Sequence, residues 1–195
     1  MIISNRIKAV LNLAVLVLTG FIINLTAEAK PLKIYILTGQ SNMLGQGNMG
    51  PATTVGTLEY TVANDPTGVY KFLVDDNKKW IIRDDVWIRD QRSKQGGLTV
   101  GYGSRDFLVG PELGFGHRIG DLLEDQVLIV KAAWGGKSLA VDFRPPSSGG
   151  KTGHYYNEIL RLVKEATTNL KTYFPDYNGQ GYEIAGFGWL RRSRA

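Results

Sequence analysis

The chain has 195 residues, and its 43% hydrophobic and 21% charged content is ordinary for one globular domain. It contains no cysteine, which excludes disulfides, thiolate nucleophiles and cysteine-ligated metal sites. The net charge is +5, but residues 1–29 contribute +1 and the last five residues contribute +3. Because the remaining charges nearly balance, the sequence predicts no basic face for nucleic acid.

Residues 1–29 have the layout of a secretory signal peptide. Arg6 and Lys8 form a positive start, residues 9–23 form an apolar segment, and Ala-Glu-Ala at 27–29 fits a cleavage site. The alternative is an uncleaved membrane anchor, but this apolar segment is shorter than the roughly 20 residues that span a bilayer. We therefore expect a secreted or periplasmic protein, with no stable membrane association after cleavage.

The mature chain begins with an apolar run rich in β-forming residues. Residues 33–38 predict a buried strand, Gly39 ends it, and a glycine-containing loop follows at 45–56. The next segment, around residues 60–90, predicts a β-rich insertion over the end of the sheet. Two segments of alternating polarity, at 69–74 and 79–82, flank an Asp-Asp-Asn-Lys turn and predict a hairpin. A third strand is predicted at 84–89. Polar, glycine-rich residues 91–109 predict a loop.

The second half of the chain alternates helices with strands. Pro111 and Glu112 suit a helix start, and an apolar stripe continues to residue 123. Two further strands, separated by an amphipathic helix at 155–170, are predicted at 127–133 and 182–190. This alternation predicts a flavodoxin-like three-layer α/β/α sandwich with a mostly parallel sheet, formed by a single domain at 30–195.

Two serines follow predicted strands and compete as a nucleophile. Ser41 lies on the turn after the first strand, at the sheet edge where open α/β folds bind ligands. Ser138 lies in a Gly-x-Ser-x-Ala pattern close to a nucleophile elbow, but prolines rather than a helix follow it. Because a loop hydroxyl is the simpler interpretation of Ser138, Ser41 is the candidate that needs a base and oxyanion donors.

The residues around Ser41 resemble a known family. Gly-Gln-Ser-Asn-Met at 39–43 resembles the first block of SGNH-type carbohydrate esterases, most closely the sialate O-acetylesterase domain and the related acetyl xylan esterases of carbohydrate esterase family six. Three further stretches resemble the family in the same order: Gly-Pro-Glu at 110–112, Ala-Ala-Trp-Gly-Gly-Lys-Ser-Leu at 132–139 and Gly-Phe-Gly-Trp-Leu at 186–190. The resemblance implies the SGNH form of the α/β fold.

The resemblance also implies a serine esterase that removes O-acetyl groups from carbohydrates, either sialic acid or acetylated polysaccharide. Ser41 would form the acyl-enzyme, and the backbone N–H of Gly136, or alternatively of Gly135, would serve the oxyanion hole. Gln40 and Asn42 would hold either the turn or the substrate. His154 lies in a stretch that borders the substrate cleft of the family. No metal or cofactor is implied.

The family pattern breaks after Leu190, where the chain reads Arg-Arg-Ser-Arg-Ala. A glutamine- or asparagine-bearing segment is missing there, and so is the Asp-x-x-His block whose histidine activates the serine. Neither His117 nor His154 has an aspartate three residues before it. We therefore expect a C-terminally truncated esterase with impaired activity and an uncovered sheet edge.

Two other functions stay open. A non-catalytic glycan-binding relative would stack sugars on aromatic side chains such as Trp80, Trp87, Trp134 and Tyr102, although core packing is the simpler account of these residues. A flavodoxin-like nucleotide binder is disfavoured, because the sequence lacks a Gly-x-x-x-x-Gly-Lys-Ser/Thr phosphate loop.

Overall fold

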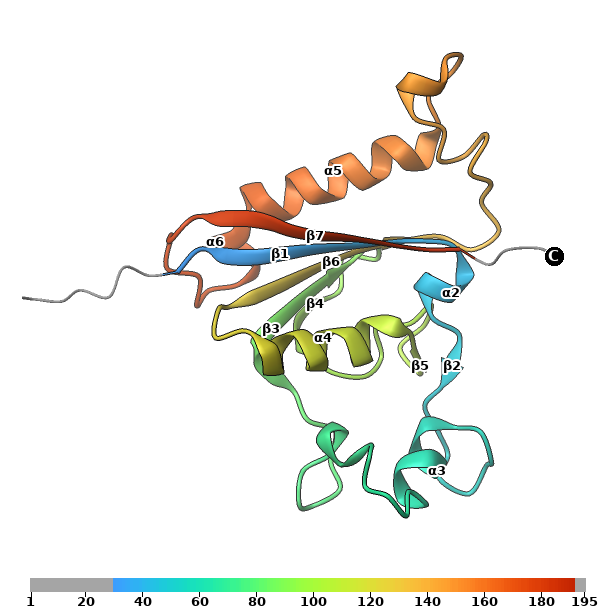
Figure 1. The fold of residues 1–195 in the computed structure, drawn as a ribbon, viewed down its shortest axis with the longest axis vertical. Coiled ribbons are helices and arrows are strands. Elements are labelled where there is room, and N and C mark those ends of the chain that lie inside the picture. Colours follow the sequence, from blue (N-terminus) through green and yellow to red (C-terminus); the bar gives the residue numbers. More distant parts are fainter. Residues whose placement is uncertain (1–29, 192–195) are drawn as a thin grey trace, which may run out of the picture.

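The computed structural model describes residues 30–191, so the predicted signal peptide lies outside the described residues. A five-stranded sheet forms the centre of the molecule, in the order β4-β3-β6-β1-β7 (Figure 1). Its strands are β1 (Leu32–Gly39), β3 (Arg83–Asp90), β4 (Gln95–Leu98), β6 (Val127–Ala133) and β7 (Tyr182–Leu190). All neighbouring strands are parallel except β4, which runs antiparallel to β3 at one edge.

Helices cover both faces of this sheet. Helix α4 (Pro111–Leu122) lies on one face, and α5 (His154–Thr168) lies on the other with the short α6 (Leu170–Tyr173) (Figure 1). The predicted three-layer α/β/α fold with a mostly parallel sheet is therefore confirmed. No helix among residues 30–191 combines the length and the apolar character needed to cross a bilayer.

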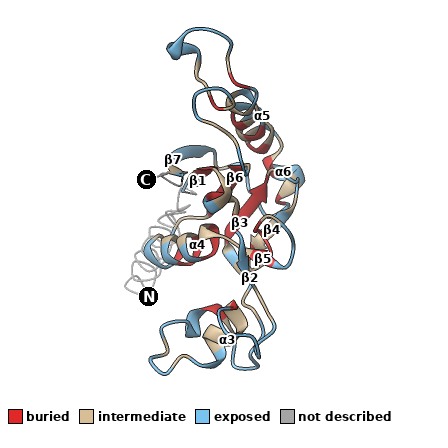
Figure 2. Ribbon diagram, turned by 90° about the vertical axis from the view of Figure 1, so that its right-hand side faces the viewer, coloured by how far each residue is buried: buried red, intermediate tan, exposed pale blue. Residues whose placement is uncertain are grey.

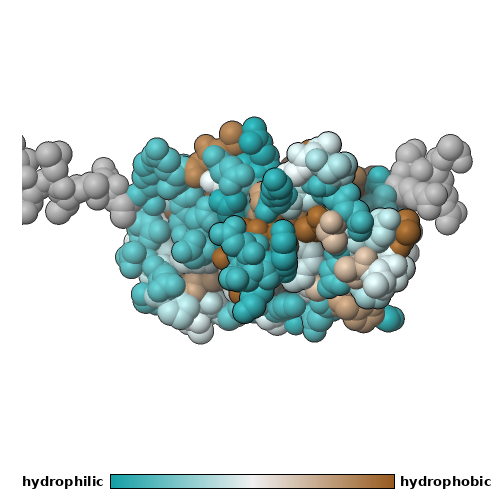
Figure 3. All heavy atoms as spheres, turned by 90° about the horizontal axis from the view of Figure 1, so that it is seen from below, coloured by the Kyte–Doolittle hydropathy of each residue, from teal (hydrophilic) through white to brown (hydrophobic). Residues whose placement is uncertain are grey.

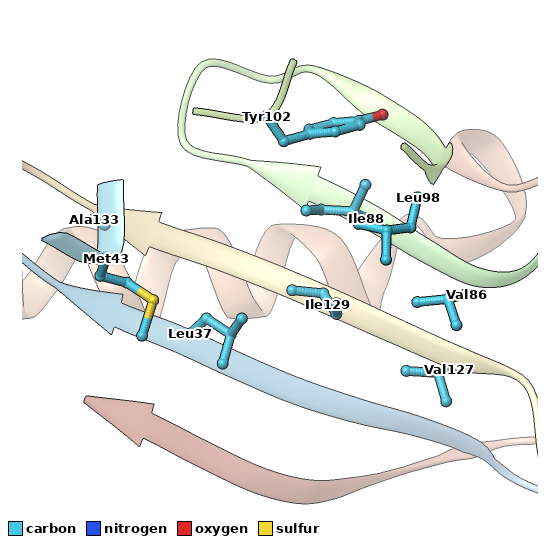
Figure 4. Close-up of a cluster of buried hydrophobic side chains, with 9 residues drawn as sticks. All are labelled: Leu37, Met43, Val86, Ile88, Leu98, Tyr102, Val127, Ile129 and Ala133. Carbon is cyan, nitrogen blue, oxygen red and sulfur yellow. The ribbon is translucent and has the colours of Figure 1, made fainter. Parts of the chain in front are cut away.

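Alternation along the strands directs side chains into cores on both faces of the sheet. Leu37 and Ile129 belong to the core on the α4 face, together with Met43 and Tyr102 (Figure 4). Ile36 belongs to a cluster on the opposite face with residues of α5. All of β6 is buried, because it is a central parallel strand covered on both sides (Figure 2).

Short elements connect the layers. Helix α2 (Ser41–Leu44) directly follows β1, and a small antiparallel pair joins β2 (Gly47–Asn48) to β5 (Leu108–Val109). A 3-10 turn, η2 (Pro146–Ser148), lies in the long connection from β6 to α5. The β2–β5 pair therefore ties the segment after α2 to the segment before α4.

The predicted β-rich character of the insertion around residues 60–90 is wrong for its first two strands. The segment contains helix α3 (Leu58–Ala63) and the 3-10 helix η1 (Lys71–Leu73). The two predicted hairpin strands meet only at a single bridge between Val74 and Trp80. Their alternating pattern predicts a strand, but an isolated hairpin without a supporting sheet gains little stability. Local hydrogen bonding therefore determines the conformation of this segment.

The third predicted strand forms, but it is β3 of the central sheet rather than part of the insertion. The polar segment at 91–109, predicted as a loop, contains β4. Gly96 and Gly97 read as loop residues, yet they pair with Ile88 and Trp87. A side chain on Gly97 would overlap the backbone carbonyl of Arg83, so here glycine permits close pairing.

Strand β7 forms an edge of the sheet and is much more exposed than β1 or β6. Phe187, for example, is 60% exposed. On the α4 face, Cβ atoms added to Gly186 and Gly188 would lie 2.7 Å from the Tyr35 ring and 2.9 Å from the Leu37 side chain. The two glycines therefore leave room for large β1 side chains to spread over β7.

Candidate active site

The turn that carries Ser41 joins β1 directly to α2. Gly39 ends the strand with φ +144°, and a Cβ there would overlap the Leu190 carbonyl oxygen, so glycine is required. The Leu44 N–H donates to the Gln40 carbonyl at 2.8 Å, and the Gly45 N–H donates to the Ser41 carbonyl at 3.0 Å. Ser41 is thus held at the first residue of a one-turn helix, at the carboxyl end of a parallel strand.

The turn after β6 lies beside the Ser41 turn. The β1–β6 register pairs Gly39 with Ala133, so the two strands end at the same level. The Trp134 N–H donates to the Gly39 carbonyl at 3.1 Å. A Cβ added to Gly135 would lie 3.9 Å from the Ser41 Cβ. The structure therefore brings together the two segments that the sequence links only through the family resemblance.

Three backbone N–H groups at these turns are available as donors. Within residues 30–191, the N–H groups of Ser41, Gly135 and Gly136 donate no hydrogen bond to another group of the protein. Gly136 has φ +70°, and a Cβ at this position would meet nothing within 4 Å. Unpaired N–H donors near a nucleophile suit the negative charge that develops on an attacked carbonyl oxygen.

Gln40 and Asn42 differ in what their side chains do. The Gln40 side-chain amide donates to the Lys137 carbonyl, which ties the β1 turn to the β6 turn. Its backbone N–H donates to the Leu190 carbonyl of β7 at 3.1 Å. Asn42 is exposed, and its side chain makes no hydrogen bond to another described residue. Gln40 therefore holds the turn, whereas Asn42 is free to contact a ligand.

Neither histidine forms a hydrogen bond with Ser41 in the described part of the chain. His117 is buried on α4, with its ring centroid 5.1 Å from that of Phe72. Burial lowers the pKa of His117, and the nearby Arg83 charge lowers it further. His154 is exposed at the start of α5, where it lines a cavity of about 490 Å³ together with Arg144. Among residues 30–191, no carboxylate or imidazole accepts a hydrogen bond from the Ser41 hydroxyl.

Ser138 is part of a closed turn. Its backbone N–H donates to the Asp142 carboxylate at 2.7 Å, and its hydroxyl accepts from the Val141 N–H at 3.1 Å. The Ser138 carbonyl accepts from the N–H groups of Asp142 and Phe143. No helix directly follows this serine. These contacts agree with a loop hydroxyl rather than a nucleophile elbow.

A buried ion pair beneath the Ser41 helix was missed by sequence reasoning. The Lys131 ammonium donates to the Glu112 carboxylate, to the Leu44 carbonyl at 2.9 Å and to the Tyr102 carbonyl at 2.6 Å. The other Glu112 oxygen accepts from the Gly110 N–H at 2.9 Å. The side chains are 0% and 1% exposed. Because Leu44 ends helix α2, the Lys131 contact fixes the Ser41 turn from below.

Burial pulls both members of this pair toward their neutral forms. It lowers the pKa of Lys131 and raises the pKa of Glu112, while the contact between the two charges opposes both shifts. All three ammonium protons have acceptors, which favours the charged form of Lys131. One sequence signal was present: a lysine inside an otherwise apolar buried strand is rare unless it is paired.

The four aromatic residues considered for sugar stacking have different environments. Trp87 is buried and stacks on Phe174 with ring centroids 4.8 Å apart, and Tyr102 is 3% exposed. Both therefore belong to the core. Trp134 is partly buried and packs on Tyr155, again at 4.8 Å. Only Trp80 lies in the insertion, where it lines a separate cavity.

The fold and the site define an α/β protein with a serine turn at the carboxyl edge of a mostly parallel sheet. The family model for the carbohydrate esterase named sialic acid-specific acetylesterase (SASA) matches residues 31–179, and the chain belongs to this family. The match includes the Ser41 and Gly135 turns and ends before β7.

One solved structure, a 1.6 Å X-ray structure of a protein from Arabidopsis thaliana, is similar with 16% sequence identity and a TM-score of 0.49. The similarity covers 83% of this chain and 58% of that one, so the chain spans less than two thirds of that protein's length. No curated protein sequence matches the chain.

Proposed function

We propose that this protein removes O-acetyl groups from carbohydrates through an acyl-enzyme formed on Ser41. The observation that carries this proposal is the position of Ser41. It begins a one-turn helix at the carboxyl end of β1, next to Gly135, inside the segment that matches the esterase family. Open α/β sheets bind ligands at this edge, so an acetyl group bound there would meet the hydroxyl.

The two adjacent turns supply a serine hydroxyl and backbone N–H donors, which are two of the components of acyl transfer. The Ser41 hydroxyl gives its proton to solvent water as its oxygen attacks the acetyl carbonyl carbon, and the carbonyl oxygen becomes negatively charged. The N–H groups of Ser41 and of Gly136 or Gly135 stabilise that charge, by about 3 kcal/mol for each well-placed donor. The bond between the acetyl carbon and the sugar oxygen then breaks, and the sugar oxygen takes a proton from solvent water. Water cleaves the acetyl-serine ester, releasing acetate and restoring the hydroxyl.

Turnover by this chain is expected to be slow. A serine hydroxyl is a weak nucleophile without a base, and no imidazole or carboxylate of residues 30–191 forms a hydrogen bond with Ser41. The same observation favours a second candidate function, in which the chain binds glycans without hydrolysing them. The two functions differ in one measurable product, the acetyl-serine ester.

Mass spectrometry of the denatured protein after incubation with p-nitrophenyl acetate tests for that ester. We expect the peptide containing Ser41 to gain one acetyl group, with slow release of p-nitrophenol. Ser41→Ala should abolish both signals, and the matched variant Ser138→Ala should leave them unchanged. Acetylation that persists in Ser41→Ala would contradict the assigned nucleophile. Fast, Ser41-dependent turnover would contradict the expected impairment.

O-acetylated sialic acid and acetylated xylan then separate the two substrate classes. Acetate released from each is measured with the wild-type chain and with Ser41→Ala. Release from neither substrate, in a chain that forms the acetyl-serine ester, would contradict the carbohydrate assignment. Export is proposed from residues 1–29, and N-terminal sequencing of the exported protein should begin at Lys30.

A further inference from the structure

The insertion contains a second cavity, of about 470 Å³, that includes no residue of the Ser41 or Gly135 turns. Helix α3, the 3-10 helix η1 and the loop tip between Val74 and Trp80 line it, together with Ala52 and Asp65. A volume of this size is within the range of small-molecule sites. The cavity is thus large enough for one or two sugar units, yet separate from the candidate nucleophile.

The lining combines an aromatic surface with charged groups of both signs. Trp80 is partly buried, and Val62 and Val74 add apolar surface. Lys71 and Glu59 also face this space. The C–H face of a sugar ring packs on an indole, while its hydroxyls need nearby donors and acceptors. This lining supplies all three requirements.

The charged side chains at the cavity form no ion pairs with other described residues. Among residues 30–191, Glu59, Lys71 and Lys78 form no ion pair. Asp65, the other acidic residue of the lining, accepts hydrogen bonds from the Thr67 and Tyr70 backbone N–H groups. Two lysines and two acids leave the cavity without net charge, which favours an uncharged ligand over an acidic one.

Local hydrogen bonds hold the walls of the cavity in place. The Thr57 hydroxyl caps α3 by accepting from the Tyr60 N–H at 3.2 Å. At the loop tip, the Asp75 carboxylate accepts from the Asn77 N–H at 2.9 Å and the Lys79 N–H at 2.8 Å. A site whose walls are fixed in advance loses less entropy when a ligand binds.

The surface on the insertion side favours a polar ligand. Seen from that side, the molecule is mostly hydrophilic, with hydrophobic areas interspersed among polar side chains (Figure 3). Protein-docking surfaces usually present larger continuous apolar patches. A small polyhydroxylated ligand fits this surface better than a protein partner does.

From these observations we infer that the insertion cavity is an accessory glycan-binding site, which holds an uncharged sugar unit against Trp80 without hydrolysing it. The choice of carbohydrate as the ligand class rests on the proposed function, whereas the cavity itself does not involve Ser41. The site would keep a polysaccharide chain on the protein while acetyl groups elsewhere on that chain reach the Ser41 turn.

The full chain carrying Ser41→Ala is screened on a glycan array of oligosaccharides that lack O-acetyl groups, both uncharged and sialylated. The uncharged oligosaccharide with the strongest signal is then titrated by calorimetry. Because this variant and these ligands involve no hydrolysis, the result does not depend on whether the esterase proposal holds. We expect Trp80→Ala to weaken binding of the uncharged oligosaccharide about tenfold.

Two pairs of variants make the result specific. Ala63→Trp adds bulk at an exposed lining position of α3 and should block binding even if Trp80→Ala perturbs the loop. Phe107→Ala removes an exposed aromatic residue outside the cavity and should have no effect. Lys78→Ala should weaken binding, whereas its neighbour Lys79→Ala should not.

Three outcomes would overturn the inference. The first is no binding of any uncharged oligosaccharide at millimolar concentration. The second is binding of sialylated oligosaccharides only. The third is binding of an uncharged oligosaccharide that survives both Trp80→Ala and Ala63→Trp.

Discussion

Replacing Glu112 with leucine should be among the most destabilising single changes in this protein. It leaves the Lys131 ammonium, 0% exposed, with two carbonyl acceptors and no countercharge, and it leaves the Gly110 N–H unpaired. Removing one partner of a buried pair typically costs about 3–5 kcal/mol. Lys131→Met should cost a similar amount, because it strands the carboxylate and removes the donor to the Leu44 carbonyl.

The double variant Glu112→Leu with Lys131→Met should be more stable than either single variant. It contains no buried charge, so the remaining cost comes from three unpaired backbone groups, at about 1 kcal/mol each, the lower end for such groups. The interaction energy in the double-mutant cycle should therefore be about 3 kcal/mol or more. Urea denaturation at constant pH and protein concentration measures all four proteins, provided that the m-value is unchanged.

An exposed pair provides the control. Lys30 and Glu124 form an ion pair at 3.0 Å with side chains 56% and 91% exposed, so Glu124→Gln should leave the midpoint unchanged. If Glu112→Leu shifts the midpoint no more than this control, the buried pair does not hold the region together. Strict additivity of the two buried substitutions would equally refute the reasoning.

Three further predictions test other parts of the molecule. Gly39→Ala should lower the free energy of unfolding by at least about 2 kcal/mol, because its Cβ would overlap the Leu190 carbonyl at a strained φ; an unchanged thermal midpoint would contradict this. Gln40→Ala should slow acetylation of Ser41 by p-nitrophenyl acetate, since it removes the tie to Lys137, and equal rates would show that the tie is dispensable. Burial lowers the folded pKa of His117, so the unfolded chain takes up that proton first. Stability should therefore fall as pH drops below the ordinary value of 6.5, and His117→Gln should flatten that slope in urea titrations at several pH values.

Three strands of the central sheet, β1, β6 and β7, were predictable because each carries its own apolar pattern. The run at 127–133 is apolar on both faces apart from Lys131, as a central parallel strand requires, and the structure forms β6 over the same residues. Pro111 begins the predicted helix at its first turn. For these elements the composition, the periodicity and the capping residues all predict the secondary structure that the fold contains. Tertiary contacts therefore reinforce the local preferences.

The prediction for the insertion was wrong because its local pattern and its surroundings in the fold disagree. Alternation at 69–74 predicts a strand, but no sheet lies there to pair with it, and η1 forms instead. Conversely, the glycines of β4 carry no strand pattern, yet they pair with β3 and form an edge strand of the sheet. In both places the outcome depends on what lies alongside in space, which one sequence does not specify.

The candidate site also contains features that local sequence predicts and features that depend on partners distant in the chain. The position of Ser41 at the end of a strand could be predicted from residues 33–41 alone. The roles of Gln40 and Lys131 could not, because each acts through a partner distant in the chain. Histidine spacing indicates that neither His117 nor His154 matches the family's base, and in the structure neither forms a hydrogen bond with Ser41.

The hydrogen bond from the Gln40 N–H to the Leu190 carbonyl has a consequence for the order of folding. Gln40 follows the first strand to be synthesised, whereas Leu190 ends the last strand of the sheet. Gln40, the residue before Ser41, therefore cannot reach its final geometry until β7 has been made and has paired with β1. Contacts between such distant segments form late and slowly. Ser41 is synthesised before β3, β6 and β7, yet its turn is completed only after β7 has paired with β1.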